Sequence, residues 1–235
     1  PKARIGGYFY NDSPDVDGQT GDIYAEIGIR DQDGNPGNGL AGHYYLMRCD
    51  NADCTSYTDL TYVRPSSWGP VYPDIPQTLS ITYDEAMNTF TFSFEGHNET
   101  VSGPPRLSPP SLSNKHIGTR VSNLVTGKYG HIRATFDNVY RNSVIYDNFE
   151  QLPALIDRSR WAQLEFLRQV DGASVYESAL TRVDINGSNN LGFIDPETVT
   201  AFQADVRIDQ VFNNSSGVGQ RARLVGTFFN NGNVG

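Results

Sequence analysis

The chain has 235 residues, 37% of them hydrophobic, and a formal net charge of −9. A chain of this length can enclose one sizeable core. It holds no apolar run of about 20 residues, the length that spans a bilayer, so membrane insertion is not expected. Its acidic balance argues against a surface that binds phosphate groups, so nucleic acid is not an expected partner.

Short segments in which apolar and polar residues alternate recur along the chain, and they predict strands. In residues 23–29, isoleucine and alanine lie on one face, while Tyr24 and Glu26 lie on the other. Residues 78–95 are predicted to form a hairpin around a turn at 84–88. Further strands are predicted at 117–123, 130–140, 164–170, 174–184, 198–211 and 221–229, with a surface loop at 103–110 and a helical pattern near 150–161. This order of elements predicts an all-β antiparallel sandwich.

The two cysteines, Cys49 and Cys54, flank four residues rich in Asp and Asn, which is typical of a loop. Free thiols and a metal site are the alternatives to a disulfide. Zinc would need about four ligands, and the four histidines show no ligand spacing. We therefore predict a disulfide between Cys49 and Cys54, which indicates an extracellular or cell-surface location.

Residues 3–12 and 222–231 have similar sequences, with five of ten positions identical. Two strands of like composition would explain this similarity. A repeat of which the chain holds one period plus a short overlap would explain it as well.

Three segments resemble parts of concanavalin A-like, laminin-G-like sandwiches. Residues 78–95, with Tyr83 and Asp84 at the turn, resemble a hairpin of these domains. Residues 134–140 (Ala-Thr-Phe-Asp-Asn-Val-Tyr) resemble their closing strand, and residues 146–149 (Tyr-Asp-Asn-Phe) resemble their opening. The resemblance implies a concanavalin A-like jelly roll in permuted order. The closing part, residues 1–141, precedes the opening part, residues 142–235.

Either part alone would leave strand edges unpaired. The two parts could close on each other as one circularly permuted domain spanning residues 1–235. Alternatively, residues 142–235 of one chain could complete residues 1–141 of the next, which builds a head-to-tail homo-oligomer or polymer. In that case Leu224 and Phe228 would supply apolar assembly contacts. The leading hypothesis is an extracellular structural or adhesive subunit that self-assembles into a filament or surface layer.

Four aspartates in one glycine-containing segment form a candidate calcium site: Asp12, Asp15, Asp17 and Asp22. Calcium takes six to eight oxygen ligands, and such a segment could supply several of them. The segment lacks the spacing of an EF-hand, and a plain solvated turn would use the same residues. No other cofactor is expected.

Aromatic residues dominate the segment 44–72, which we expect to be largely a long loop. The candidate glycan-binding residues in it are Tyr57, Tyr62, Trp68 and Tyr72, because sugar rings stack on aromatic side chains. The alternative is that these residues belong to the core or to an assembly contact. A secreted lectin-like carbohydrate-binding module, assisted by calcium or not, is the second hypothesis.

A polysaccharide-cleaving enzyme is the third hypothesis. Glycosidases with the concanavalin A-like fold that this sequence resembles place two or three carboxylates on one strand face. In this chain, Glu26 is the only carboxylate on its predicted strand. Asp205, Arg207 and Asp209 do share a face, but an exposed charge ladder explains them as well. No Gly-x-Ser-x-Gly motif is present. We therefore predict no catalytic residue.

Overall fold

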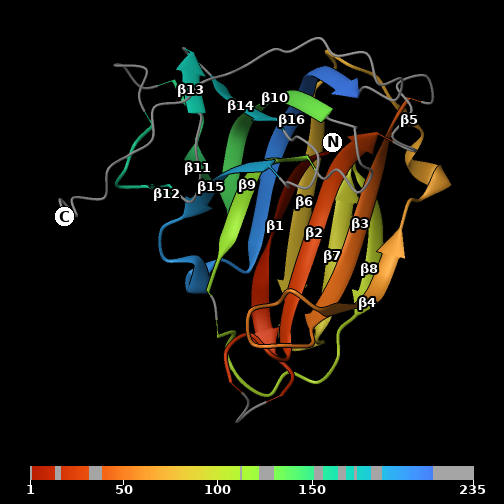
Figure 1. Cartoon of the computed structure of the whole chain (residues 1–235), viewed down its shortest axis with the longest axis vertical. Helices are drawn as coiled ribbons and strands as arrows, with labels where there is room; N and C mark the ends of the chain where they lie inside the picture. The colour runs from red at the N-terminus through yellow and green to blue at the C-terminus, as the bar shows by residue number, and fades with distance from the viewer. Residues whose placement is uncertain are drawn as a thin grey trace.

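The computed structural model describes residues 2–13, 17–31, 39–111, 113–121, 130–150, 156–163, 168–171, 174–180 and 187–213. These residues form two antiparallel sheets that lie face to face (Figure 1). Sheet A contains β1 (Lys2–Asn11), β2 (Asp22–Asp31), β3 (Leu40–Cys49), β4 (Tyr57–Val63), β5 (Pro70–Val71), β9 (Lys115–Val121), β12 (Trp161–Gln163) and β15 (Gly187–Phe193). Sheet B contains β6 (Gln77–Asp84), β7 (Thr89–Phe94), β8 (His97–Ser102), β10 (Gly130–Arg141), β11 (Val144–Asp147), β13 (Arg168–Asp171), β14 (Ser174–Leu180) and β16 (Ala201–Asn213).

The strand order is β12-β15-β9-β1-β2-β3-β4 in sheet A, with β5 beside β3. In sheet B it is β13-β14-β10-β16-β6-β7-β8, with β11 beside β10. Two short 3-10 helices, η1 (Ser66–Trp68) and η2 (Pro196–Thr198), connect strands. The predicted all-β antiparallel sandwich is confirmed, while its assignment to the concanavalin A-like group stays a prediction.

The two predicted parts of the chain are interleaved. β16, from the second part, lies between β10 and β6, which belong to the first part. β15 pairs in the same way with β9. Strands of both parts therefore pair with each other within one chain. Leu224 and Phe228, on which the assembly hypothesis rests, lie outside the described residues, and so does the segment 222–231 that is similar to residues 3–12. The assembly hypothesis therefore stays a prediction.

The core lies between the inner faces of the two sheets. The alternation of apolar and polar residues places Ile23, Ile27 and Ile29 of β2 inside, in the same hydrophobic core as the phenylalanines of β7. The register of β1 against β2 shifts between Tyr8 and Tyr10. Such an irregularity lets two consecutive residues face the same side, and Phe9 and Tyr10 both join the core.

Most predicted strands match the structure where it describes them. The hairpin at 78–95 is β6 and β7, joined by a turn at 85–88. The segments at 23–29 and 130–140 are β2 and β10, and the described residues of the segment 117–123 belong to β9. Segment 198–211 is β16, which starts at Ala201 because η2 precedes it. Segments 164–170 and 174–184 are described only in part, as β13 and β14, and 221–229 lies outside the described residues. Residues 103–110 lack a strand, as expected of a loop, apart from one bridge at Ser108.

Two predictions of local structure differ from the structure where it describes them. Residues 150 and 156–161 of the segment with a helical pattern contain no helix, and residues 151–155 lie outside the described residues. There the Asp157 side chain accepts a hydrogen bond from the Ser159 amide at 2.8 Å, and such local bonds compete with helix formation. The segment 44–72 is not a long loop, because it contains most of β3 and all of β4 and β5.

The predicted disulfide is confirmed. Cys49, the last residue of β3, is bonded to Cys54, with 4.9 Å between their Cα atoms. Trp161 is buried in the core, also as expected. None of the helices in the described part of the chain is long and apolar enough to cross a membrane.

Candidate functional site

A buried carboxylate lies on the outer face of sheet A, the face turned away from the core. Glu26 follows the alternation of β2 outward, yet it is 0% exposed. Its Oε2 accepts hydrogen bonds from Arg4 Nη1 at 2.8 Å, Tyr24 Oη at 3.0 Å and Tyr45 Oη at 3.2 Å. Its Oε1 accepts one from Lys2 Nζ and lies 3.3 Å from His43 Nε2. We call these residues the Glu26 cluster: Lys2, Arg4, Tyr24, Glu26, His43 and Tyr45.

Glycines on neighbouring strands make room for these long side chains. Gly6 pairs with Glu26 across β1 and β2, and Gly28 pairs with Arg4. A Cβ atom at Gly6 would lie 2.6 Å from the Tyr24 hydroxyl, and one at Gly28 would lie 3.0 Å from His43 Cε1. The side chains of the cluster therefore lie across the sheet in space that other residues would fill.

Burial and ion pairing set the protonation states of the cluster. Burial alone would raise the pKa of Glu26, but the charges of Lys2 and Arg4 outweigh it and hold that pKa well below its usual range. Burial lowers the pKa of His43 to about 4, so its imidazole is neutral at pH 7. Burial also lowers the pKa of Lys2 to about 8, against the pull of the Glu26 charge. At neutral pH the cluster therefore contains one carboxylate, two cations and a neutral histidine.

Two buried nitrogens of the cluster lack a hydrogen-bond partner among the described residues. They are Arg4 Nε and His43 Nδ1. The other nitrogens of the Arg4 guanidinium are engaged: Nη1 also donates to the Tyr24 hydroxyl at 3.0 Å, and Nη2 lies 3.5 Å from Asn190 Oδ1. A buried polar atom without a partner costs about 1–3 kcal/mol. The cluster is thus less fully satisfied than a purely structural charge network would be.

The cluster reaches the surface beside β4. Tyr62, which is 42% exposed, pairs with Tyr45, and their ring centroids are 6.4 Å apart. The Tyr62 hydroxyl accepts hydrogen bonds from Arg30 Nη1 at 2.6 Å and from Arg64 Nε at 2.9 Å. Lys2 Nζ lies 5.0 Å from the centroid of the Tyr45 ring. We call this surface the outer-face patch: Lys2, Arg30, Tyr45, Tyr62 and Arg64.

The predicted glycan-binding residues separate into two groups. Tyr57 and Tyr62 lie on β4, and both are exposed, as is Tyr72. Trp68 instead lies inside the sandwich, only 5% exposed, with its ring stacked on Phe94 at 5.1 Å. Of the predicted set, Tyr62 alone adjoins the Glu26 cluster in the described contacts.

The candidate calcium ligands are largely engaged with protein groups. Asp12 accepts two hydrogen bonds from Arg48 Nε, each 2.8 Å long. Asp22 is buried and accepts hydrogen bonds from Asn11 Nδ2 and from the Ser111 amide, both 2.8 Å long. Asp17 is exposed, and Asp15 lies outside the described residues. Within the described ranges, no three or more His, Cys, Asp or Glu side chains converge as a metal site would require. Calcium binding stays a prediction.

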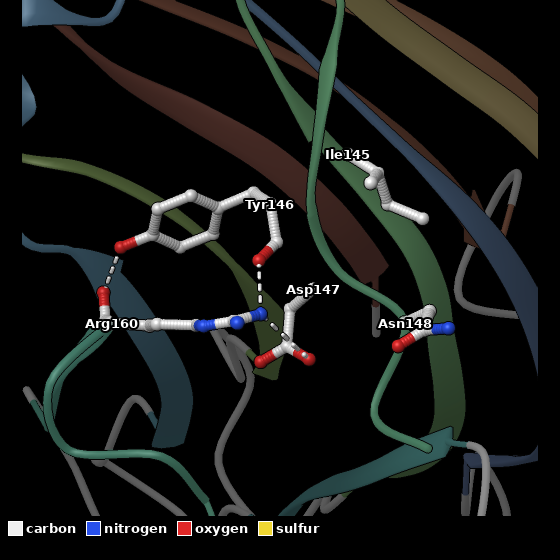
Figure 2. Close-up of a pocket in the computed structure, with 5 residues that line it drawn as sticks. All are labelled: Ile145, Tyr146, Asp147, Asn148 and Arg160. Atoms are coloured by element: carbon white, nitrogen blue, oxygen red, sulfur yellow. Dashed lines mark hydrogen bonds and ion pairs between the residues drawn. The ribbon is translucent and has the colours of Figure 1, made fainter. Parts of the chain in front are cut away.

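A cavity of about 260 Å³ lies elsewhere, beside β11 (Figure 2). The Arg160 guanidinium donates to the Tyr146 carbonyl at 2.7 Å and lies 3.9 Å from Asp147. Asp147 in turn accepts a hydrogen bond from the Trp161 indole at 2.6 Å. Figure 2 shows that Tyr146, Asp147 and Arg160 point toward one another. The cavity is therefore a product of the bonds that anchor Trp161, and we do not take it as the functional site.

The sequence reasoning missed Lys2, Arg4 and His43. They come from β1 and β3, and only the pairing of these strands with β2 brings them to Glu26. One signal was present in the sequence: Arg4 and His43 each occupy an otherwise apolar or small-residue strand segment, at positions that alternate with core residues.

No family model, no curated protein and no solved structure matches this chain. Its function is therefore inferred from the residues described above.

Proposed function

We propose that the protein is a secreted carbohydrate-binding protein that holds its ligand at the outer-face patch. The observation that carries this proposal is the exposed ring of Tyr62, whose hydroxyl is fixed by Arg30 and Arg64 beside the buried Glu26 cluster. A sugar ring can stack on such a tyrosine while arginines bind its hydroxyls, since aromatic side chains offer an apolar face with a polar end. The disulfide between Cys49 and Cys54 supports the oxidising location that secretion implies.

The energetics of the Glu26 cluster also support a function at this face. Burying a carboxylate with two cations costs desolvation free energy that their attraction does not always recover. Replacing a buried ion pair by apolar residues of similar size is often neutral or stabilising. Strongly shifted pKa values cluster at functional sites, and those of Glu26 and His43 lie next to the exposed Tyr62 here.

The same geometry favours binding over glycoside hydrolysis. A general acid needs a raised pKa, whereas Lys2 and Arg4 hold the pKa of Glu26 low. The next acidic residue on its face of β2 is Asp22, four residues away, or about 13 Å along a strand. That separation exceeds the 5–9.5 Å typical of glycosidase carboxylate pairs. Asp22 is also engaged by Asn11 and Ser111.

The test is retention of the protein by polysaccharides in affinity electrophoresis, with two matched tyrosine variants. Tyr62→Ala should weaken retention by about tenfold, the loss expected for one stacking contact. Tyr57→Ala is the control, because Tyr57 is also exposed on the same strand but lies at its other end. No retention by any polysaccharide, or equal losses in both variants, would contradict binding at the outer-face patch.

A further inference from the structure

A third cation adjoins the Glu26 cluster on its β9 side. Arg120 is the direct cross-strand partner of Lys2, on the strand that flanks β1 opposite to β2. Residues directly opposite in an antiparallel pair have Cβ atoms about 5 Å apart, on the same face. Arg120 therefore lies on the outer face of sheet A with Lys2, and its charge acts on Lys2. Like charges in this relation destabilise a sheet unless an anion lies between them.

The carboxylate of Glu26 does not neutralise this group. Lys2, Arg4 and Arg120 are three cations, and among the described residues Glu26 is the one carboxylate that forms an ion pair with Lys2 or Arg4. Within the same residues, Arg120 forms no ion pair. The surplus positive charge stands out in a chain with a net charge of −9. An anion from outside the protein would compensate it.

The surplus positive charge lies where a ligand at the outer-face patch would contact it. The Lys2 side chain is 17% exposed and lies against the ring of Tyr45, which adjoins Tyr62. Arg4, in contrast, is buried and bonded to Glu26, Tyr24 and Asn190. Of the three cations Lys2, Arg4 and Arg120, it is therefore Lys2 and Arg120 that a bound molecule can reach, while Arg4 holds Glu26 in place.

We infer that the carbohydrate bound at the outer-face patch carries an acidic group, a carboxylate or a sulfate, and that Lys2 and Arg120 bind this group. This inference rests on the proposed function and narrows its ligand to acidic polysaccharides. Such a ligand explains why cations face each other across β1 and β9. It also predicts that binding weakens as salt is added, because partly exposed charges are screened.

The experiment compares binding to immobilised neutral, uronate-containing and sulfated polysaccharides. The wild-type protein should bind acidic polymers and not neutral ones, and the polymer class retained tells a carboxylate ligand from a sulfate ligand. Arg120→Gln should weaken this binding by about tenfold or more, the effect of one charge-assisted hydrogen bond. Arg133→Gln is the control, since it makes the same charge change at an exposed position on the outer face of sheet B. Thermal melting checks that both variants are folded.

The outcomes separate this inference from the proposed function. Neutral polymers bound as well as acidic ones, with sensitivity to Tyr62→Ala but not to Arg120→Gln, would overturn the acidic ligand and leave carbohydrate binding intact. Equal losses in Arg120→Gln and Arg133→Gln would show a general charge effect and would also overturn the inference. Binding to none of the polymers would overturn both.

Discussion

Replacing Glu26 by glutamine should strongly destabilise the fold. The substitution keeps the shape of the side chain but removes the one charge that compensates Lys2 and Arg4, whose nitrogens contact its oxygens. Glu26 is fully buried, and removal of one partner from a buried ion pair typically costs about 3–5 kcal/mol. This is a large part of the roughly 5–15 kcal/mol that stabilises a typical domain. At about 2–4 °C per kcal/mol for a chain of this size, the melting temperature should fall by about 6–20 °C.

Urea unfolding followed by tryptophan fluorescence measures this loss, because Trp68 and Trp161 are both buried. Glu85→Gln is the control, since it breaks a surface ion pair with Arg106 and should cost less than about 1 kcal/mol. The pKa of Glu26 is held low in the folded protein, so its contribution is complete above about 4.5, the ordinary pKa of a glutamate. The contribution is lost as the pH falls further, and the wild type and Glu26→Gln should then converge. A loss no larger than that of Glu85→Gln at pH 7 would refute the account of the Glu26 cluster.

Two further stability predictions follow from burial. His43 has its pKa lowered to about 4, so its neutral form is favoured in the folded state. The contribution of neutral His43 to the free energy of unfolding should be complete above pH 6.5, the ordinary pKa of a histidine. The free energy of unfolding should decline by up to about 3 kcal/mol as the pH falls toward 4. Melting curves of His43→Gln should show a smaller decline, and an unchanged decline would contradict the assignment. Trp68→Ala should cost about 3–5 kcal/mol because it empties a core site against Phe94, whereas Tyr72→Ala at an exposed position should cost little. Equal unfolding midpoints for these two variants would place Trp68 outside the core.

The sequence predicted those parts of the fold that depend on residues close together in the chain. The hairpin at 78–95 could be recognised because β6 and β7 each have one buried and one more exposed face, so their sequences alternate. The disulfide could be predicted because five residues of separation in a polar loop bring two cysteines together. The segment 40–49 escaped recognition as a strand, since nearly all of its residues are buried on both faces of sheet A and its sequence does not alternate.

The candidate site depends on strand pairing, which alternation does not determine. The polar face of β2 could be predicted to carry Tyr24 and Glu26. Its neighbours could not, because the sequence does not show that β1 and β3 flank β2, nor in which register. A shift of one residue in β1 would turn Arg4 into the core and remove it from Glu26. The exposed tyrosine on β4 was predicted as a ligand contact, but the reason to select Tyr62 over Tyr57 came only from the structure.

The centre of each sheet is occupied by a strand from a different end of the described chain. β1 lies between β9 and β2, and β16 lies between β10 and β6. During synthesis, β6 and β10 are therefore complete well before the strand that joins them has left the ribosome. Two strand edges stay open over this interval, and open edges recruit other chains. Such distant pairings also form slowly, so production of this protein should benefit from chaperones that shield β6 and β10 until residues 201–213 arrive.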